Sequence, residues 1–333
     1  MHILLIHQAF VSPREAGGTR HFEFARHALK KAHHFTIVAS DLSYLTGQRY
    51  SSGRSLVSQE TTDGIRILRA YTYPALHKSF VWRVISFLSF MVTSVLAGLR
   101  AEKVDLVMGT SPPIFQAVSA WMVALLRRKP FILEVRDLWP AFAIDMGILT
   151  NPVLIFLSHG LERFLYARAR HIIVNSPAYR DYLMKQGIRP GNISLISNGV
   201  DIGMFENADG TSFREEWGLD RTFVVTYAGA LGVANDIPVI LRAAERLKHN
   251  NRIRFVLVGD GKERARLQET ARRQDLKNVV FTGSRPKSEM PSILAGSDAC
   301  VATLQDIPMF KTTYPNKVFD YMAAGRPTIL GID

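Results

Sequence analysis

The sequence has a single cysteine among its 333 residues. One cysteine excludes an intramolecular disulfide and a metal site built from several cysteines, and it fits a reducing compartment best. Cys300 itself stands in a short apolar run, so we expect a small buried hydrophobic residue and not a nucleophile. The first residues, Met1–His7, have no basic leader, long apolar core or small-residue cleavage site. We therefore expect them to form a first strand of a cytoplasmic protein.

The glycine fingerprints of nucleotide binding are also missing. Neither G-x-G-x-x-G nor the P-loop pattern occurs, which disfavours a dinucleotide oxidoreductase. The basic residues are scattered, with no recognition helix or aromatic-basic ribbon, so nucleic-acid binding ranks last among the functions considered. A hydrophobic share of 47% and a charged share of 21% are typical of a folded protein.

The positive charge is distributed unevenly. The formal net charge is +12, and residues 1–170 carry 20 Lys and Arg against 11 Asp and Glu, a net of +9. This asymmetry indicates that the first half binds an anionic partner. A membrane surface and nucleic acid are both anionic partners of this kind. A merely soluble basic surface is the alternative.

Short β-branched runs alternate with amphipathic stretches almost from end to end, which predicts parallel sheets covered on both faces. The strands predicted in the first half are 3–7, 35–39, 65–69, 106–109, 131–135, 172–175 and 193–196, and the helices are 19–31, 114–126, 154–167 and 178–185. The strands predicted in the second half are 223–229, 254–259, 279–282, 299–303 and 328–330, and the helices are 237–248, 263–273, 288–295 and 317–324.

The alternation of strands and helices is interrupted after Asn198-Gly199-Val200-Asp201, where the polar stretch 206–212 shows no strand pattern. The chain therefore divides into a predicted domain over 1–205 and a second over 206–333, both doubly wound and Rossmann-like. Ligands of open parallel sheets bind at the carboxyl ends of the strands, so we expect the chemistry in a cleft between the two sheets. Because the last predicted strand has no helix after it, we expect the second domain to be truncated.

An apolar segment, Val84–Leu99, contains no charge and is bracketed by Arg83 and Arg100. Its 16 residues are fewer than the roughly 20 that span a bilayer, so a spanning helix is disfavoured. One interpretation is a helix lying in a membrane interface, helped by the basic first half. The other is a core helix of the first sheet.

Three segments carry candidate functional residues. Gly17-Gly18 precedes a helix, where the backbone can approach a phosphate, although a plain turn explains the pair nearly as well. Glu134, Arg136 and Asp137 follow a predicted strand at its carboxyl end, which favours a catalytic role; the alternative is that Asp137 caps a short helix.

The third segment, Tyr314 to Pro327, is the strongest. Lys317 falls in the first turn of a predicted helix, where a cation opposes the helix dipole and an anionic ligand would relieve the conflict. Asp320 lies one turn further on the same face and can accept the hydroxyls of a ribose. The alternative is a simple Lys317–Asp320 salt bridge. Arg285, at the end of another strand, can reach a phosphate bidentately.

At this segment the sequence resembles glycosyltransferase family four. The similarity rests on Pro315-Asn316-Lys317, the run 319–327, Asn198-Gly199-Val200-Asp201 and Gly17-Gly18, and it extends over the whole chain. The branch it resembles most contains bacterial fucosamine-type transferases of O-antigen and capsule synthesis, in which the pattern 136–140 recurs.

The resemblance implies a retaining enzyme of GT-B architecture that needs no metal or other cofactor. It implies a nucleotide-sugar donor, with a UDP-linked amino sugar favoured, and a polyprenyl-diphosphate-linked or growing glycan acceptor. The enzyme would be peripheral to the cytoplasmic face of the inner membrane. With this resemblance, the expected donor-binding residues are Gly17, Gly18, Arg285, Asn316, Lys317 and Asp320. The expected catalytic residues remain Glu134, Arg136 and Asp137, from their position at the strand end.

The sequence departs from that family in ways that affect these expectations. Two glutamates eight positions apart are common there, whereas here the pair is Thr312 and Asp320. The Arg and Lys that often follow the first strand of the second domain are absent from 229–236. Two alternatives therefore stay open: a sugar-nucleotide epimerase of the same fold, in which His7 and His21 act with the Glu134–Asp137 group, and a non-catalytic nucleotide-sugar-binding protein.

Overall fold

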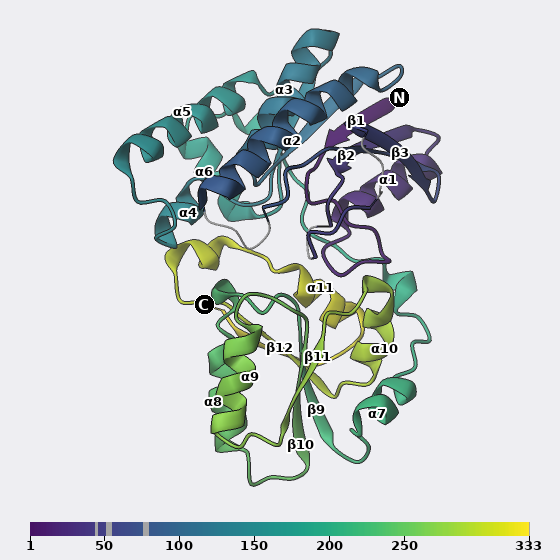
Figure 1. The fold of residues 1–333 in the computed structure, drawn as a ribbon, viewed down its shortest axis with the longest axis vertical. Helices are drawn as coiled ribbons and strands as arrows, with labels where there is room; N and C mark the ends of the chain where they lie inside the picture. Colours follow the sequence, from purple (N-terminus) through teal and green to yellow (C-terminus); the bar gives the residue numbers. More distant parts are fainter. Residues whose placement is uncertain (44–45, 51–54, 76–79, 333) are drawn as a thin grey trace. The chain divides into compact units, whose positions relative to one another are not determined.

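The computed structural model describes residues 1–43, 46–50, 55–75 and 80–332. Two compact units make up the chain: residues 1–11 with 21–197, and residues 12–20 with 198–333. The short segment 12–20 therefore belongs to the second unit, although it lies near the start of the sequence. The main division falls between Ser197 and Asn198, a few residues before the predicted boundary after residue 205. Figure 1 shows both units as sheets flanked by helices.

An eight-stranded sheet forms the centre of the first unit, in the order β3-β4-β2-β1-β5-β6-β7-β8. All neighbouring pairs are parallel except β3 with β4. The strands are β1 (His2–Ile6), β2 (His34–Ser40), β3 (Val57–Thr62), β4 (Ile65–Ala70), β5 (Leu106–Ser111), β6 (Phe131–Val135), β7 (His171–Val174) and β8 (Ile193–Leu195). The seven strands predicted in this half all exist, and β3 is additional.

The missed strand, β3, is an edge strand whose sequence after Val57 is polar. Such a strand buries few side chains, so the hydrophobic pattern that reveals a central strand is absent. Its antiparallel pairing with β4 runs from Val57 opposite Ala70 to Thr62 opposite Ile65.

The helices of the first unit include the four predicted from the alternating pattern, the apolar helix expected over 84–99, and one more, α4. They are α1 (Arg20–Lys30), α2 (Phe80–Arg100), α3 (Ile114–Arg127), α4 (Ala141–Asp145), α5 (Pro152–Arg168) and α6 (Pro177–Lys185). Helix α2 contains the apolar segment 84–99. It packs on α3, and α3 packs on α5, so these helices form one layer (Figure 1).

The second unit holds a five-stranded parallel sheet in the order β11-β10-β9-β12-β13. The strands are β9 (Phe223–Ala228), β10 (Ile253–Val258), β11 (Val279–Gly283), β12 (Ala299–Thr303) and β13 (Thr328–Gly331). The helices are α7 (Thr211–Trp217), α8 (Ile237–Arg246), α9 (Arg264–Arg273), α10 (Met290–Ala295) and α11 (Asn316–Ala323). Each predicted strand and helix of this half is confirmed, with ends that differ by one or two residues.

Apolar side chains cover both faces of this second sheet. One cluster centres on Tyr227, Leu257 and Leu241, and another on Val256, Leu294 and Tyr321. Cys300 is buried in the second cluster, and burial raises the pKa of its thiol to about 12. The expectation of a buried hydrophobic residue at this position is confirmed.

Candidate functional site

Helix α11 begins with the residues on which the predicted donor site depends. Pro315 precedes the helix and has no side-chain acceptor, so no side chain caps the first turn, although the N–H of Val318 donates to Pro315 O at 3.1 Å. Lys317 lies in this turn, and its Nζ donates to Tyr227 Oη at 2.7 Å and to Asn235 Oδ1 at 2.9 Å. Burial lowers the pKa of Lys317 to about 7, because both acceptors are neutral and desolvation disfavours the charged amine.

A glycine makes room for this lysine. Gly229 follows β9 with a φ of +153°, and a Cβ added to it would lie 3.0 Å from Cε and Nζ of Lys317. It would also lie 3.3 Å from Tyr227 Oη. A side chain at this position would therefore both strain the backbone and push against the amine. The end of β9 and the start of α11 are therefore in close contact through Gly229 and Lys317.

Asp320 lies one turn further along α11 and has a different partner. Its Oδ1 accepts from Nζ of Lys287 at 2.5 Å, and the two side chains are only 17% and 12% exposed. Burial raises the pKa of Asp320, and Lys287 opposes that shift. The alternative of a Lys317–Asp320 salt bridge is wrong, because each residue is bonded to another element of the unit.

The segment 12–20 lies against this same region of the second unit. The backbone N–H of Lys287 donates to Glu15 O at 3.1 Å, and that of Ser288 donates to Pro13 O at 3.1 Å. A Cβ added to Gly18 would lie 3.1 Å from Nδ2 of Asn316, the first residue of α11. The predicted glycine pair is thus brought to the start of α11, where Asn316, Lys317 and Asp320 also lie.

Arg285 is not brought to this group. Its guanidinium pairs with Glu216 and with Glu289, at 3.3 Å for the latter, and lies over the ring of Trp217 at 5.6 Å. Lys287, two residues further on, is the cation that approaches Asp320. A proline at 286 separates the two residues, and the sequence pattern alone does not show which of them turns toward α11.

A second polar cluster lies in the first unit, at the carboxyl ends of β1 and β6. His21 on α1 and Glu134 on β6 are both buried, with Nε2 of the histidine 2.5 Å from Oε2 of the glutamate. The ring of His7 lies 4.4 Å from the ring of His21, between centroids. Arg136 donates through Nη2 to His7 Nε2 at 3.3 Å and through Nε to Thr110 Oγ1 at 2.9 Å.

The electrostatics of this cluster follow from burial. Burial lowers the pKa of His7 well below its ordinary value, and His21 and Arg136 lower it further. Within the described residues, Nδ1 of His7 is buried without a hydrogen-bond partner. Because His7 accepts from Arg136 through Nε2, we assign the proton of the neutral ring to Nδ1. A buried N–H without a partner is uncommon in folded proteins, which marks this atom as a candidate contact for water or a ligand.

Asp137 follows Arg136 and is partly buried. Burial raises the pKa of its carboxyl to about 6, and the neighbouring Arg136 opposes the rise. The short helix α4 begins only at Ala141, after Pro140. The alternative that Asp137 caps this helix is therefore wrong, and its carboxyl is available for another role.

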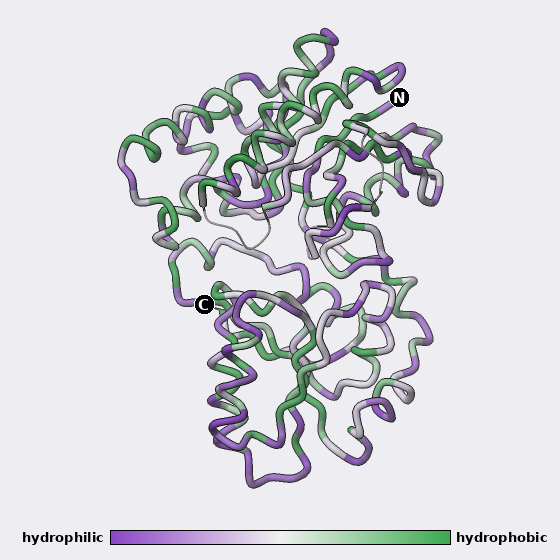
Figure 2. The backbone as a smooth tube through the Cα atoms, in the orientation of Figure 1, coloured by the Kyte–Doolittle hydropathy of each residue, from purple (hydrophilic) through white to green (hydrophobic). Residues whose placement is uncertain are grey.

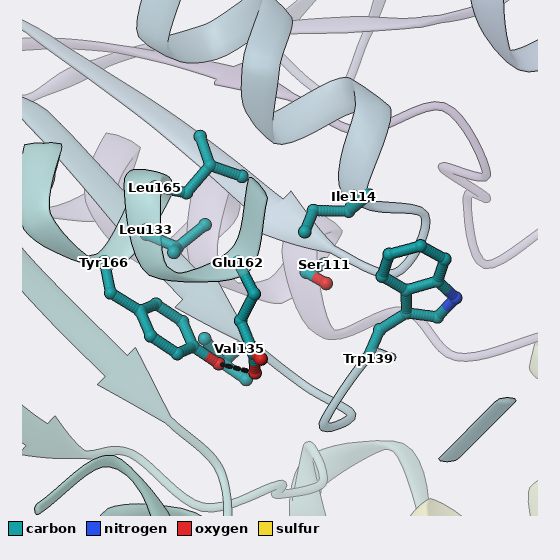
Figure 3. Close-up of a pocket in the computed structure, with 8 residues that line it drawn as sticks. All are labelled: Ser111, Ile114, Leu133, Val135, Trp139, Glu162, Leu165 and Tyr166. Atoms are coloured by element: carbon teal, nitrogen blue, oxygen red, sulfur yellow. Dashed lines mark hydrogen bonds between the residues drawn. The ribbon is translucent and has the colours of Figure 1, made fainter. Parts of the chain in front are cut away.

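A pocket in the first unit lies beside Trp139 (Figure 3). Its lining is mostly apolar and includes Ile114, Leu133 and Leu165 together with the carboxylate of Glu162. Tyr166 Oη donates to Glu162 at 2.9 Å, and the remaining pocket residues are Ser111, Val135 and Trp139. His159 also contacts Glu162, at 3.1 Å. This carboxylate is satisfied by protein groups, which is typical of a structural role.

Sequence reasoning missed several members of both clusters. Lys287, Tyr227 and Asn235 come from separate elements, and they meet α11 only through the sheet topology. In the first unit, the pairing of His21 with Glu134 joins residues 113 positions apart. Among the described residues, no group of three or more His, Cys, Asp or Glu side chains is arranged to hold a metal ion.

Together, the groups at the start of α11 suit a nucleoside diphosphate. A lysine amine, a helix start without a side-chain cap and a close-approaching glycine backbone can provide for the phosphates, and the carboxylate of Asp320, which also pairs with Lys287, can provide for a sugar hydroxyl. The cluster of the first unit instead combines a hydrogen-bond donor, a buried His–Glu pair and the Asp137 carboxyl, whose pKa burial raises to about 6. It suits proton transfer or the positioning of hydroxyl groups.

Two family models match the chain in agreement with this architecture. The Glycosyl transferase 4-like domain matches residues 16–199, more than half of the chain, and the Glycosyl transferases group 1 matches residues 222–331. The family models and the fold together show a glycosyltransferase of the GT-B type. The chain belongs to the family that carries the Glycosyl transferase 4-like domain, which confirms the family-four resemblance.

Curated relatives are enzymes of the same kind. WcaI of Escherichia coli K12, described as a colanic acid biosynthesis glycosyl transferase, is 23% identical over 85% of this chain and 71% of its own length. The GDP-mannose-dependent alpha-mannosyltransferase of Mycobacterium tuberculosis is 28% identical over 57% of this chain. The match covers 46% of the mannosyltransferase, so the chain spans less than half of that relative.

Solved structures show the same fold. HepE of Anabaena, crystallised with UDP-glucose, superposes with a TM-score of 0.69 over 99% of this chain and 80% of HepE, at 16% identity. WaaG, a glycosyltransferase involved in lipopolysaccharide biosynthesis, superposes with a TM-score of 0.68 over 98% of this chain and 80% of WaaG, at 13% identity. The predicted pair of Rossmann-like domains in GT-B architecture is confirmed.

Proposed function

We propose that this glycosyltransferase moves a sugar from a UDP-linked donor to a lipid-linked or growing cell-surface glycan, with retention of the anomeric configuration. The observation that carries the donor half is the arrangement at the start of α11, where Lys317 is held by neutral acceptors one turn from Asp320 and Gly18 lies beside Asn316. The donor diphosphate is proposed to supply the negative charge that pairs with the Lys317 amine. Asp320 is proposed to accept hydroxyl groups of the ribose.

In the proposed reaction, the bond between the sugar C1 and the diphosphate oxygen breaks as the acceptor oxygen approaches C1 on the same face. The acceptor proton passes to an oxygen of the departing diphosphate. Lys317 and the amides of α11 stabilise the negative charge that develops on that group, which is the usual electrostatic route to rate. No metal or other cofactor enters this proposal.

The cluster of the first unit is proposed to hold the reacting groups. Asp137 and Arg136 are proposed as catalytic residues that contact the sugar or acceptor, and His7 Nδ1 provides a further donor. Glu134 is proposed to act through His21, because it is fully buried and its carboxylate is 2.5 Å from that ring. These roles come from position and chemistry together with the family resemblance.

The choice of UDP is supported by the resemblance to fucosamine-type transferases and by the UDP-glucose bound to HepE. The curated mannosyltransferase relative uses GDP-mannose instead, so the base must be tested. The proposed setting is the synthesis of a bacterial surface polysaccharide such as O-antigen or capsule. An amino sugar as the transferred group is part of the same proposal.

Calorimetric titration of the purified chain with UDP, GDP, dTDP, ADP and NAD tests the donor assignment. We expect micromolar binding of UDP and at least tenfold weaker binding of the others. Selective binding of GDP would overturn the choice of base and keep the site, whereas binding of NAD alone would overturn the transferase proposal. Product analysis with the matching sugar nucleotide then separates transfer from epimerisation, because an epimerase changes the donor without an acceptor.

A further inference from the structure

Helix α2 turns its larger aliphatic side chains away from the fold. Ile85, Leu88, Val92, Leu96 and Leu99 follow at intervals of three or four residues, which places them on one side of the helix. Between 37% and 59% of each of these residues is exposed. Every exposed residue between 84 and 99 is apolar. Figure 2 shows most of α2 in the colour of hydrophobic residues.

The side of α2 that faces the fold is the more polar one. Thr93, Ser94 and Ala97 are buried there beside Phe90. Thr93 Oγ1 donates to Tyr71 O at 2.6 Å, so this hydroxyl is used to attach the helix to the sheet region. A helix at a water-exposed surface normally has the reverse arrangement, with apolar residues inward and polar residues outward. The outer side of α2 is therefore suited to an apolar environment.

Helix α5 begins with a second exposed apolar group. Val153, Leu154, Phe156 and Leu157 are 63%, 42%, 77% and 58% exposed. Asn151 caps the helix by accepting from the backbone N–H groups of residues 153 and 154 at 3.0 and 3.2 Å, so this first turn is well formed. Because α2 and α5 both pack on α3, the two apolar groups belong to one helical layer (Figure 1).

Charge favours one occupant for this surface. Arg83 and Arg100 lie exposed at the two ends of the α2 stripe, and Arg163 is exposed on α5. Residues 80–101 contain no carboxylate, and residues 1–170 carry a net charge of +9. A bilayer with anionic headgroups satisfies both the apolar stripe and the arginines. A second copy of a chain with a net charge of +12 brings like charges together instead.

Helix α2 is also tied to α3 along its length. The stretch Val81–Arg100 is long and apolar enough to cross a membrane. However, a Cβ added to Gly98 would lie 2.8 Å from Val123 Cγ2, which shows how closely the two helices approach. Ser119 Oγ on α3 also donates to Met91 O at 3.1 Å. These contacts favour a helix that lies in the interface while it remains part of the fold.

We propose that the outer side of α2 and the first two turns of α5 form a membrane-docking face. The aliphatic and aromatic side chains of this face enter the boundary between headgroups and acyl chains, and the flanking arginines contact lipid phosphates. The inference goes beyond the proposed function. Vesicle binding is measured without donor or acceptor, so the membrane face and the transferase activity can fail separately.

Flotation of the full chain with vesicles of phosphatidylethanolamine, with and without phosphatidylglycerol, tests the docking face. The test variant is Leu88→Ser/Val92→Ser/Leu96→Ser. The matched control is Phe223→Ser/Val239→Ser/Leu247→Ser, which changes three exposed apolar residues of the second unit. We expect the test variant to lower vesicle partitioning at least about tenfold and the control by less than about twofold.

A further pair of changes examines the charges. Arg83→Ala/Arg100→Ala is expected to weaken binding several-fold to vesicles that contain phosphatidylglycerol, and to leave binding to neutral vesicles unchanged. Unaltered unfolding temperature and nucleoside diphosphate affinity show that each variant is folded. The proposal is overturned if the unmodified chain does not float with either vesicle, or if the test variant binds like the control. It is also overturned if the stripe instead mediates a dimer that the test variant dissociates.

Discussion

The two polar clusters differ in how their charges are balanced. In the first unit, buried Glu134 already has His21 as its partner, and Arg136 is directed into the protein by His7 and Thr110. In the second unit, Lys317 has only neutral acceptors, and α11 presents a helix start without a side-chain cap. The charged groups Glu134 and Arg136 of the first cluster are thus bonded to protein side chains, whereas the charged form of Lys317 in the second cluster gains from an anion. The contrast supports the proposal that the donor binds at the second unit and that the first unit positions the reacting groups.

The largest expected effect tests the binding side of this contrast. Lys317→Ala should lower the transfer rate by about 10²–10³-fold, because it removes a cation from the leaving diphosphate. The affinity for UDP should fall roughly tenfold or more while the affinity for uridine stays unchanged. Steady-state kinetics and calorimetry measure these quantities. The control, Lys277→Ala, removes a lysine whose side chain is 84% exposed. Equal losses for UDP and uridine would contradict the assignment of Lys317 to the phosphates.

A comparison of two buried glutamates of the first unit tests whether its polar cluster positions the reacting groups. Glu134→Gln should lower kcat by about tenfold or more and leave the UDP affinity unchanged, because it disturbs the ring of His21 and not the donor site. Glu162→Gln is the matched control, since that carboxylate is equally buried and hydrogen-bonded. Both changes should lower the free energy of unfolding by about 1–3 kcal/mol. If both variants lose activity in proportion to stability, Glu134 has only a structural role.

Asp320 and its partner separate ribose recognition from local charge balance. Asp320→Ala should weaken UDP and uridine alike, by roughly tenfold, because a carboxylate acceptor for the ribose is lost. Lys287→Ala should have a smaller effect that appears mainly at low pH. Removal of the amine raises the pKa of Asp320 further, so its carboxylate is protonated at a higher pH. Isothermal titration at several pH values measures both. A selective loss of UDP over uridine in Asp320→Ala would move that residue to the phosphates.

The pKa of Lys317 predicts a pH effect of a few-fold. The free amine is charged below about pH 7 and neutral above it. A bound diphosphate favours the charged form and raises this pKa, so binding above pH 7 must take up a proton. Affinity is therefore independent of this group below pH 7 and falls as the pH rises above it. Calorimetry at pH 8 in buffers of different ionisation enthalpy should detect the proton uptake, and Lys317→Ala should abolish it.

Arg285 gives the smallest expected effect. Its guanidinium is already engaged by Glu216, Glu289 and the ring of Trp217. Arg285→Ala should therefore change the UDP affinity by less than about twofold. A loss comparable with that of Lys317→Ala would show that this arginine leaves its partners when the donor binds, in line with the expectation from the sequence.

Local pattern was sufficient for much of the fold and for part of the candidate site. Near-continuous apolar runs identify the central strands, and the helical spacing of Lys317 and Asp320 places both on one face of α11. What the sequence could not provide are the partners that arrive from elsewhere. Lys287 and Tyr227 reach α11 through strand order, and His21 reaches Glu134 across the sheet. The polar edge strand β3 was missed because it lacks a buried face, and the outward direction of the α2 stripe depends on packing that no single helix specifies.

The placement of Lys317 and Asp320 on one short helix has a consequence for how the two proposed contacts depend on each other. Residues three apart on an α-helix are separated by about 4.5 Å along its axis. Both residues belong to one helix, so the proposed ribose contact and the proposed phosphate contact cannot shift independently of each other. A change that moves or unwinds α11 is therefore expected to weaken both contacts together.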